Sequence, residues 1–305
     1  MNQPINTAIT ESPLAAQSAA IVSDDGMVTR RLGPFFWIAV GWIVLVMLAA
    51  LLAPWLPLKD PNKNYIDRSL GRPPYSPSSE FWFGTDKDAR DMFSRTIWGA
   101  RVSLTVGFVA IACGILVGGT FGVLAGHFRG WWDRIVSFVF VVLLSFPALV
   151  LAILITTLVN RSLFTISVTL GILAIAPVGR LARATTIQFS EREFVVAART
   201  LGASNRRIII RELLPNVVIP MGALALLGMA VAIVAEGALA FLGLSIQKGE
   251  SWGKLIQIGA ESSRTLNDAP WIAFAPIGVL FLTVAALNFC GDKVRAHFDV
   301  REAAL

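Results

Sequence analysis

An acidic residue inside an apolar stretch is the first candidate for chemistry in this sequence. Glu236 lies in the run from residue 217 to 244, which holds no other charged side chain. A carboxylate at the centre of a bilayer costs about 2.5 to 3.5 kcal/mol on insertion scales, so it needs a role. It could line a pathway, pair with a basic group of a partner, accept hydrogen bonds within a helix bundle, or relay protons as acids do in secondary transporters. The residue alone leaves these roles open.

Intramembrane hydrolysis is a second candidate chemistry, because Ser145 and His127 also lie in or near apolar runs. Its motifs are missing: no Gly-x-Ser-x-Gly surrounds any serine, and no His-Glu-x-x-His occurs. We therefore expect no catalytic residue and no enzymatic activity in this chain.

Nucleotide, metal and redox sites also lack their patterns. The nearest approach to a Gly-x-x-x-x-Gly-Lys-Ser/Thr loop, "GESWGKL" at 249–255, is one residue short and has Leu where the magnesium-binding hydroxyl belongs. Cys113 and Cys290 lie inside apolar runs without a Cys-x-x-Cys motif, where a thiol behaves as a small hydrophobe. His297 is a lone histidine near the end of a run, which suits a surface position. The chain is expected to bind no cofactor and no metal.

The composition is that of a membrane protein. Of 305 residues, 55% are hydrophobic and 15% charged, and the mean hydropathy is +0.67. Soluble domains have about 45 to 50% apolar residues. The apolar runs are continuous rather than alternating, which favours helices over a barrel. The net charge of +6 comes from short segments between the runs, where anionic lipid accounts for it, so no nucleic acid partner is expected.

Six runs supply the roughly 20 apolar residues that a membrane helix needs. They lie near residues 35–56, 102–126, 135–159, 163–179, 217–244 and 271–290. The fourth run is short and is expected to end at Pro177. The predicted organisation is a disordered cytoplasmic tail (1–34), a first transmembrane helix (35–58), an extracytoplasmic loop (59–98), a five-helix core (99–291) with a cytoplasmic loop at 180–215, and a C-terminal tail (292–305).

Basic residues beside the runs indicate the orientation. They occur at 30–31, at 129–134, seven times as arginine within 180–211, and at 293–301. With six spans these segments share one side, which the positive-inside rule identifies as the cytoplasm. Both termini are therefore predicted to be cytoplasmic.

The second run carries glycines at every fourth position, which are Gly114, Gly118, Gly122 and Gly126. Overlapping Gly-x-x-x-Gly steps place a glycine groove on one helix face and allow another backbone to approach closely. The groove predicts helix packing, either within the chain or, as the alternative, against a partner subunit.

The stretch "EFVVAARTLGASNRRIIIRELLPN" at 193–216 is a basic insert between two apolar runs. Its first part has the apolar spacing of an amphipathic helix, which Gly202 ends. A second short helix begins near Ser204 or Asn205, which are good N-caps, and is expected to break or kink at Pro215. The pattern predicts a helix-turn-helix elbow. From the residues alone, a helix lying on the lipid surface is an equal alternative.

The elbow resembles the cytoplasmic loop of permease subunits of binding-protein-dependent ABC importers. The pattern of that loop is Glu-Ala-Ala, three residues, Gly, nine residues, then Ile-x-Leu-Pro. The positions that match are Ala197, Ala198, Gly202, Leu214 and Pro215. Val196 stands where the pattern has Glu, and Glu212 where it has Ile.

Three further stretches are similar to the dipeptide and oligopeptide (peptide/nickel) branch of these permeases, in the shorter-looped of its two subunit types. The segment 83–107 resembles the branch's approach to the second span, with Ala89 where Gly is usual. "EGALAFLGLS" from Glu236 resembles the fifth-span signature, with Ala240 and Ser245 replacing a common Ser and Gly. "GDKVRAHFD" from Gly291 is similar to the C-terminal ending.

This resemblance implies an all-α polytopic protein with the six-helix type I importer permease fold, in the bacterial cytoplasmic (inner) membrane. It implies a permease that forms half of a peptide pathway. The implied partners are a homologous permease, two ATPase subunits (two copies of one protein or one copy each of two), an extracytoplasmic peptide-binding protein and the lipid bilayer. ATP and Mg would be bound by the ATPases.

The resemblance also implies roles for particular residues. Glu236, present in the signature whatever the cargo, would be structural or gating, with a proton-coupled secondary transporter using Glu236 as the alternative function. The cargo stays open among dipeptides, oligopeptides, glutathione and nickel complexes. The residues implied in ATPase coupling are Ala197, Ala198, Leu201, Gly202, Ala203, Ser204 and Pro215.

Overall fold

The computed structural model describes residues 33–303, so the tail predicted at 1–34 lies outside the described residues except for its last two. The described helices all belong to one compact unit that starts at Pro34. Within these residues the fold is helical, and the only extended pairing is a single bridge between Thr85 and Asp91. The prediction of an all-α fold is confirmed.

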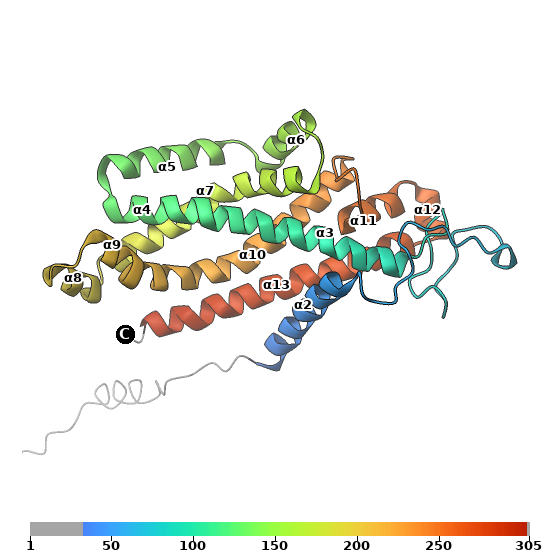
Figure 1. Cartoon of the computed structure of the whole chain (residues 1–305), viewed down its shortest axis with the longest axis horizontal. Helices are drawn as coiled ribbons and strands as arrows, with labels where there is room; N and C mark the ends of the chain where they lie inside the picture. Colours follow the sequence, from blue (N-terminus) through green and yellow to red (C-terminus); the bar gives the residue numbers. More distant parts are fainter. Residues whose placement is uncertain (1–32, 304–305) are drawn as a thin grey trace, which may run out of the picture. The chain divides into compact units, whose positions relative to one another are not determined.

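Long helices run side by side along this unit, with short helices at both ends (Figure 1). The elements in chain order are α2 (Pro34–Leu52), η1 (Arg68–Leu70), α3 (Met92–Cys113), η2 (Gly114–Gly119), α4 (Thr120–Phe128), α5 (Gly130–Ser145), α6 (Ala148–Leu158), α7 (Leu163–Ser190), α8 (Glu193–Thr200), α9 (Asn205–Arg207), η3 (Ile208–Leu213), α10 (Leu214–Phe241), α11 (Trp252–Ala260), α12 (Ser263–Asp268) and α13 (Trp271–Ala303).

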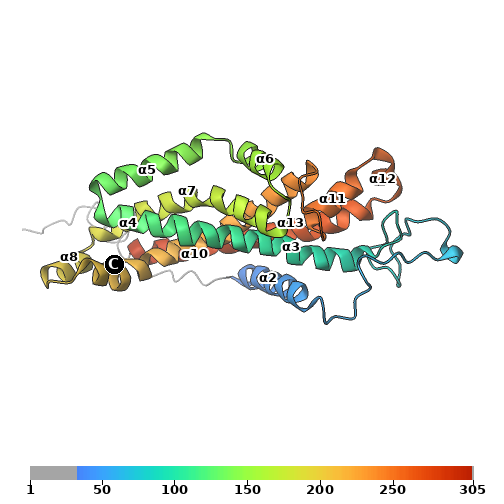
Figure 2. The ribbon, with the colours of Figure 1, turned by 45° about the horizontal axis from the view of Figure 1, so that its top comes forward.

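Five of the described helical runs are long and apolar enough to cross a bilayer, and α5 with α6, a pair bent by 84°, is long and apolar enough for a sixth if the pair forms one span. These correspond to the six predicted runs. α3, η2 and α4 form one run of 37 residues, and so do α9, η3 and α10. Figure 2 shows α3, α7 and α10 running together through the unit, with α2 beside them as a separate oblique helix.

The glycine groove of the second run packs against α7 of the same chain. A Cβ on Gly118 would lie 2.1 Å from the carbonyl oxygen of Ile175, and one on Gly122 would lie 2.3 Å from that of Gly179. Gly114 and Gly126 face α7 in the same way, at Ala174 and Arg183. The groove thus lets the two backbones touch, which larger side chains at these four positions would prevent.

The fourth run does not end at Pro177. α7 continues for thirteen residues beyond it, to Ser190, so the expected boundary near residue 179 is wrong. Proline removes one backbone hydrogen bond, but packing from neighbouring helices tolerates this within a bundle. Here the residues on either side of Pro177, Ala176 and Val178, are buried in clusters shared with α4 and α5. The elbow therefore projects from the end of a helix that spans the whole bundle.

The expected break at Pro215 is also absent. The chain passes from α9 through the π-helix η3 into α10 without a turn, and Pro215 occupies the first turn of α10. A π-turn has a wider ring than an α-turn, so it gives room for a proline that follows it. The second helix of the elbow and the fifth span form one continuous helical run.

The α5 helix lies on α7, where apolar packing and an ion pair attach it. The ring of Phe140 fills the space above Gly179, where a Cβ would lie 2.2 Å from the ring. Asp133 near the start of α5 forms an ion pair with Arg183 of α7 through two hydrogen bonds. Leu143 packs against the same buried cluster as Phe140 and Ala176 of α7, and after Ser145 the chain bends by 84° into α6.

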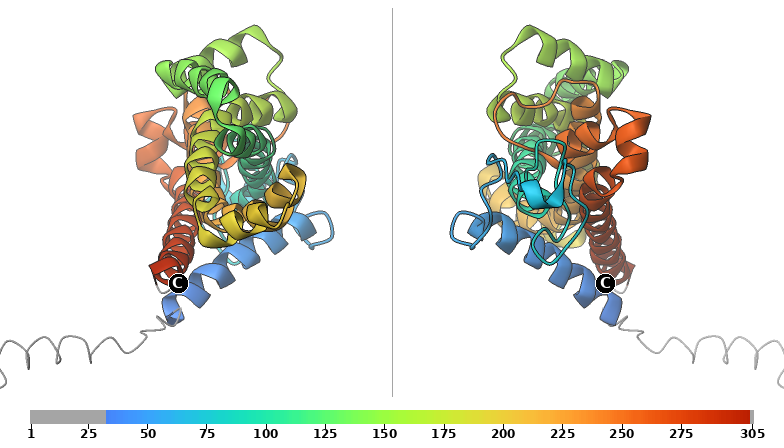
Figure 3. Two further views of the ribbon diagram at one scale, coloured as in Figure 1. Left: turned by 90° about the vertical axis from the view of Figure 1, so that its left-hand side faces the viewer. Right: turned by 90° about the vertical axis from the view of Figure 1, so that its right-hand side faces the viewer.

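Segment 53–91 and helices α11 and α12 gather at the end of the unit opposite α8. The right-hand view of Figure 3 looks onto this end, and the left-hand view looks onto the α8 end. Most of segment 53–91 is irregular, with a small core of Tyr75, Phe81 and Ala89. At the start of α3, Asp91 caps the helix by accepting a hydrogen bond of 2.8 Å from the Ser94 amide. The second long run therefore begins at Met92, ten residues before residue 102, where hydrophobicity alone places its start.

Candidate functional site

The elbow, residues 193–213, is built by two caps that the sequence encodes. At the end of α8 the amide of Ala203 donates to the carbonyl of Ala198 and that of Gly202 to Arg199, each at 3.0 Å. These two bonds make a Schellman motif, which needs a left-handed residue, and Gly202 provides it with φ of +80°. Ser204 then caps α9, its side chain accepting from the Arg207 amide. The caps fix the angle between α8 and α9.

The inner face of the elbow belongs to the main core of the unit. Val195 of α8 and Ile208 and Leu213 of η3 are fully buried, in one cluster with Phe189 of α7 and Val217 of α10. Interiors of this kind are close-packed and transmit strain. A force on α8 therefore reaches both α7 and α10.

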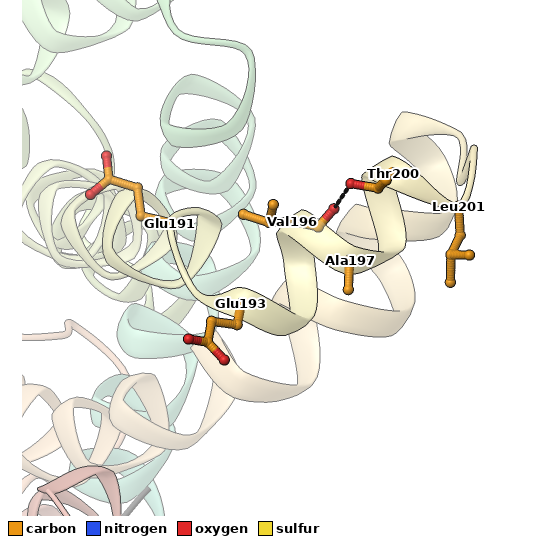
Figure 4. Close-up of a pocket in the computed structure, with 6 residues that line it drawn as sticks. All are labelled: Glu191, Glu193, Val196, Ala197, Thr200 and Leu201. Carbon is orange, nitrogen blue, oxygen red and sulfur yellow. Dashed lines mark hydrogen bonds between the residues drawn. The ribbon is translucent and has the colours of Figure 1, made fainter.

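The outer face of the elbow is apolar and uncovered within the chain. Leu201, at the tip, is 88% exposed, and Val196 is 53% exposed. Figure 4 shows Ala197 and Leu201 on the same side of α8, and the hydrogen bond from the Thr200 hydroxyl to the Val196 carbonyl. A shallow depression of about 500 Å³ lies along this face, bordered by Glu191 and Glu193. An exposed apolar surface rimmed by charge is typical of an interaction site.

The structure brings most of the predicted coupling residues together at this tip. Ala197, Leu201, Gly202 and Ser204 are exposed there, while Ala198 and Ala203 are half-buried and join through the Schellman bond. Pro215 lies apart from them, beyond the six residues of η3. It lies in the first turn of α10 rather than at the tip.

Glu236 is buried within the unit, with hydroxyl groups around it. Ser103 of α3 donates to one carboxyl oxygen and Ser245, after α10, donates to the other, each at 3.4 Å. Ser103 also accepts from the Trp252 amide at the start of α11. Buried polar groups that are satisfied in this way fix their neighbours in place. Glu236 thus joins α3, α10 and α11, and no described basic side chain pairs with it.

A buried charge cluster lies near Glu236 in the fold, and sequence reasoning did not single it out. Arg95 of α3 is fully buried and forms ion pairs with Asp86 and Glu250, the latter at 2.9 Å. Trp252, two residues after Glu250, is also fully buried and donates to the Thr96 carbonyl at 3.0 Å. Losing one member of a buried pair costs about 3 to 5 kcal/mol, because it leaves a charge without a partner. The cluster fastens α11 and segment 53–91 to α3.

One signal could have indicated this cluster. Arg95 lies only seven residues before the apolar run at 102, where an unpaired cation is costly. Its partners come from 9 and 155 residues away, and spacing of that kind cannot be read from one sequence. Among the side chains that the structure describes, no three of His, Cys, Asp or Glu gather as metal ligands would.

The relatives of this chain are transport permeases. The chain is 36% identical over 263 residues to the dipeptide transport system permease protein DppC of Alkalihalophilus pseudofirmus, covering 85% of this chain and 84% of the relative. It is 33% identical to the glutathione transport system permease protein GsiD of Pectobacterium atrosepticum, covering 86% of each.

The fold has a solved counterpart and a matching family model. A chain of the MetNI methionine ABC transporter in an inward-facing crystal structure superimposes with a TM-score of 0.53 and 19% identity, covering 68% of this chain and 97% of that one. This likeness shows the fold, which is that of a type I importer permease as predicted. The family model described as "Binding-protein-dependent transport system inner membrane component" matches residues 118–302. With more than half of its length matched and relatives above 30% identity along most of it, the chain belongs to this family of ABC importer permeases.

Proposed function

We propose that this chain is a permease subunit of an ATP-driven peptide importer in the bacterial cytoplasmic membrane. It would form half of the translocation pathway and pair with a homologous permease. Two ATPase subunits, either two copies of one protein or one copy each of two proteins, would bind ATP and Mg. An extracytoplasmic peptide-binding protein would deliver the cargo. The observation that carries the proposal is the elbow. It has an exposed apolar tip at Ala197 and Leu201 and a buried root, formed by Val195, Ile208 and Leu213, in the core of the unit.

The elbow has the properties that ATPase coupling needs. Its tip, with Ala197 and Leu201, offers small and apolar side chains that can enter a groove of a moving subunit. Its root is shared with α7 and α10, so that closure of the ATPases would tilt both helices together. A helix that only rested on lipid would not need a root in the core of two spans.

The orientation follows from the same element. An ATPase acts from the cytoplasm, so the elbow end would be cytoplasmic, in agreement with the arginines of 180–211. Segment 53–91 with α11 and α12 would then face the binding protein on the other side.

Peptides are the proposed cargo class because the relatives named above carry dipeptides and glutathione, which is itself a small peptide, according to their names. The proton-coupled alternative finds no support. It leaves the elbow without a use, and the serines around Glu236 offer no second titratable group to pass a proton to.

The test is uptake by the whole complex in reconstituted vesicles, with the binding protein present. Labelled dipeptide, tripeptide and glutathione would be supplied separately, each with ATP and again with only a pH gradient. Accumulation that requires ATP and a peptide is expected. Uptake driven by the pH gradient alone would reject the importer, and ATP-driven uptake of a non-peptide cargo only would reject the substrate class.

A further inference from the structure

The turn between α6 and α7 and the loop that follows α10 enclose a cavity. It has a volume of about 320 Å³ and is lined mostly by polar side chains, among them Thr157, Asn160, Arg161 and Gln247. α7 runs from this turn to the elbow, and α10 runs from the elbow back to the loop, so the cavity lies at the end of the unit opposite the elbow (Figure 1). Ligand sites have volumes of about 300 to 1,000 Å³, so a small ligand group fits here.

Arg161 lies in this cavity as a cation without a counter-ion. Its guanidinium donates a hydrogen bond to the Gly243 carbonyl, and among the described residues no carboxylate lies within ion-pair distance of it. The Arg161 carbonyl accepts from the Gln247 amide at 3.0 Å, which fixes the backbone on both sides of the cavity. A guanidinium has five N–H donors, so one carbonyl leaves most of them available to a ligand.

The surroundings of Arg161 favour an anion. α6 contains no charged residue, and α7 contains none before Arg180. In the loop after α10, Lys248 is exposed, and the Glu250 carboxylate is already paired with a buried arginine of α3. The N-terminus of α7, a helix of 28 residues, begins two residues after Arg161 and carries the positive end of the helix dipole. Positive charge therefore dominates around the cavity.

Two neutral donors flank the guanidinium. The side-chain amides of Asn160 and Gln247 line the cavity, and neither has a hydrogen-bond partner in the described part of the chain. The hydroxyls of Thr156 and Thr157, in contrast, already donate to carbonyls of α6. A carboxylate accepts two parallel hydrogen bonds from an arginine and has lone pairs left for amide donors. The donor set of this cavity thus suits a carboxylate.

We propose that this cavity, the Arg161 cavity, binds the C-terminal carboxylate of the peptide cargo, with Arg161 as the charged partner and Asn160 and Gln247 as neutral donors. The proposal rests on the proposed function and adds to it a cargo-binding site in the permease itself. Every unmodified peptide has this carboxylate whatever its side chains, so such a site accepts many sequences. The phosphate of an anionic lipid has the same charge, but the mostly polar lining suits a hydrated cargo better than acyl chains.

Protection of a cysteine in the cavity tests the proposal. Thr157→Cys keeps all the proposed donors, and it would be labelled with the neutral reagent N-ethylmaleimide in the assembled complex, in phosphatidylcholine nanodiscs without the binding protein. The unsubstituted chain gives the background of Cys113 and Cys290. A dipeptide should slow the labelling. The same dipeptide with a C-terminal amide should need a concentration about tenfold higher, or more, because it lacks the charged hydrogen bonds.

Substitutions of the cation show whether it recognises the carboxylate. Arg161→Gln should remove the difference between the dipeptide and its amide, whereas Arg161→Lys, which keeps a charged donor, should keep part of it. A purely structural role of Arg161 would change the protection by both ligands equally. The matched control is Arg264→Gln on α12, which removes a cation that is 92% exposed and does not line the cavity, and it should keep the full difference.

Equal protection by the dipeptide and its amide, or by neither, would overturn the proposal. Labelling that is slowed by phosphatidylglycerol in the nanodiscs, and not by dipeptide, would also overturn it and would assign Arg161 to a lipid phosphate. Leu244→Cys, which also lines the cavity, replaces Thr157→Cys if that variant fails to assemble.

ATP-driven uptake is measured separately, in vesicles with the binding protein. Uptake without protection rejects the carboxylate site alone, whereas protection without ATP-driven uptake rejects the importer and leaves the carboxylate site in place.

Discussion

Glu236 shows how a single acid can be accommodated in an apolar bundle. Its two oxygens accept from the hydroxyls of Ser103 and Ser245, which lie on different elements. Ser245 stands where the related signature has Gly, so this chain supplies a donor that a glycine would not. The arrangement needs an acceptor at position 236 but does not need a charge.

We therefore expect Glu236→Gln to keep assembly and most of the transport. The amide has the size of the carboxylate and keeps one acceptor oxygen. Its NH₂ group can donate a hydrogen bond to a serine hydroxyl oxygen. Glu236→Leu is the matched control, because it leaves the two hydroxyls unpaired, at about 1 to 3 kcal/mol each. ATP-driven uptake and thermal stability of the purified complex measure both. Lost uptake by a stable Glu236→Gln complex would show that the charge itself is required.

Single residues also show where one sequence is informative. Ala89 stands where the related permeases usually have Gly, and in this fold it is buried with φ of +59°, a conformation that favours glycine. The departure was visible in the sequence, although its geometry was not. Arg95 was not recognised, because its partners are brought to it only by the tertiary fold.

Helix boundaries that depend on nearby residues could be predicted from the sequence. The elbow follows from Gly202 and Ser204, whose effects on the backbone act within three or four residues. Pro177 and Pro215 were misleading, since bundle packing and the π-turn of η3 accommodate them. Pro147 did break a helix, within a run that appeared continuous by hydrophobicity. The outcome at each proline depends on neighbours that one sequence does not reveal.

The contact between the second long run and α7 gives a prediction at the level of elements. Gly118→Ala would place a Cβ 2.1 Å from a backbone oxygen of α7, where no side-chain rotation can relieve it. We expect a loss of about 3 kcal/mol, at the upper end of overpacking costs. Gly222→Ala in α10 is the control, since no atom lies within 4 Å of its Cβ, and it should change stability by less than about 1 kcal/mol. Thermal unfolding of detergent-solubilised protein compares them, and equal stabilities would disprove the close contact.

The orientation of the chain in the membrane can be tested by labelling one residue at each end of the unit. Ser78 and Asn205 are both exposed, and the parts that hold them, segment 53–91 and α9, lie at opposite ends of the unit (Figure 1). With a membrane-impermeant thiol reagent on intact spheroplasts, Ser78→Cys should label and Asn205→Cys should not. Inverted vesicles should give the reverse. Labelling of both positions from one side would disprove the six-crossing arrangement.

The coupling of ATP hydrolysis to transport is a property of the whole complex, and Gly202 is the residue at which to test it. Its Cβ position is open, with no heavy atom within 4 Å, and its φ is +80°. Any L residue there carries a backbone strain of about 1 to 2 kcal/mol. Gly202→Ala has only this strain, while Gly202→Trp adds a bulky ring to the tip of the elbow.

We expect Gly202→Trp to assemble and hydrolyse ATP without importing peptide, because the ring keeps the tip from seating while the root at Val195 and Ile208 is untouched. Gly202→Ala should keep most of the uptake. The measurement is substrate-stimulated ATPase activity beside peptide uptake, with complex assembly checked by size exclusion. Equal loss in both variants would assign the effect to backbone strain. Full uptake by Gly202→Trp would mean that the tip rests on lipid, where an added tryptophan at the headgroup level is favourable, and coupling would then require another surface.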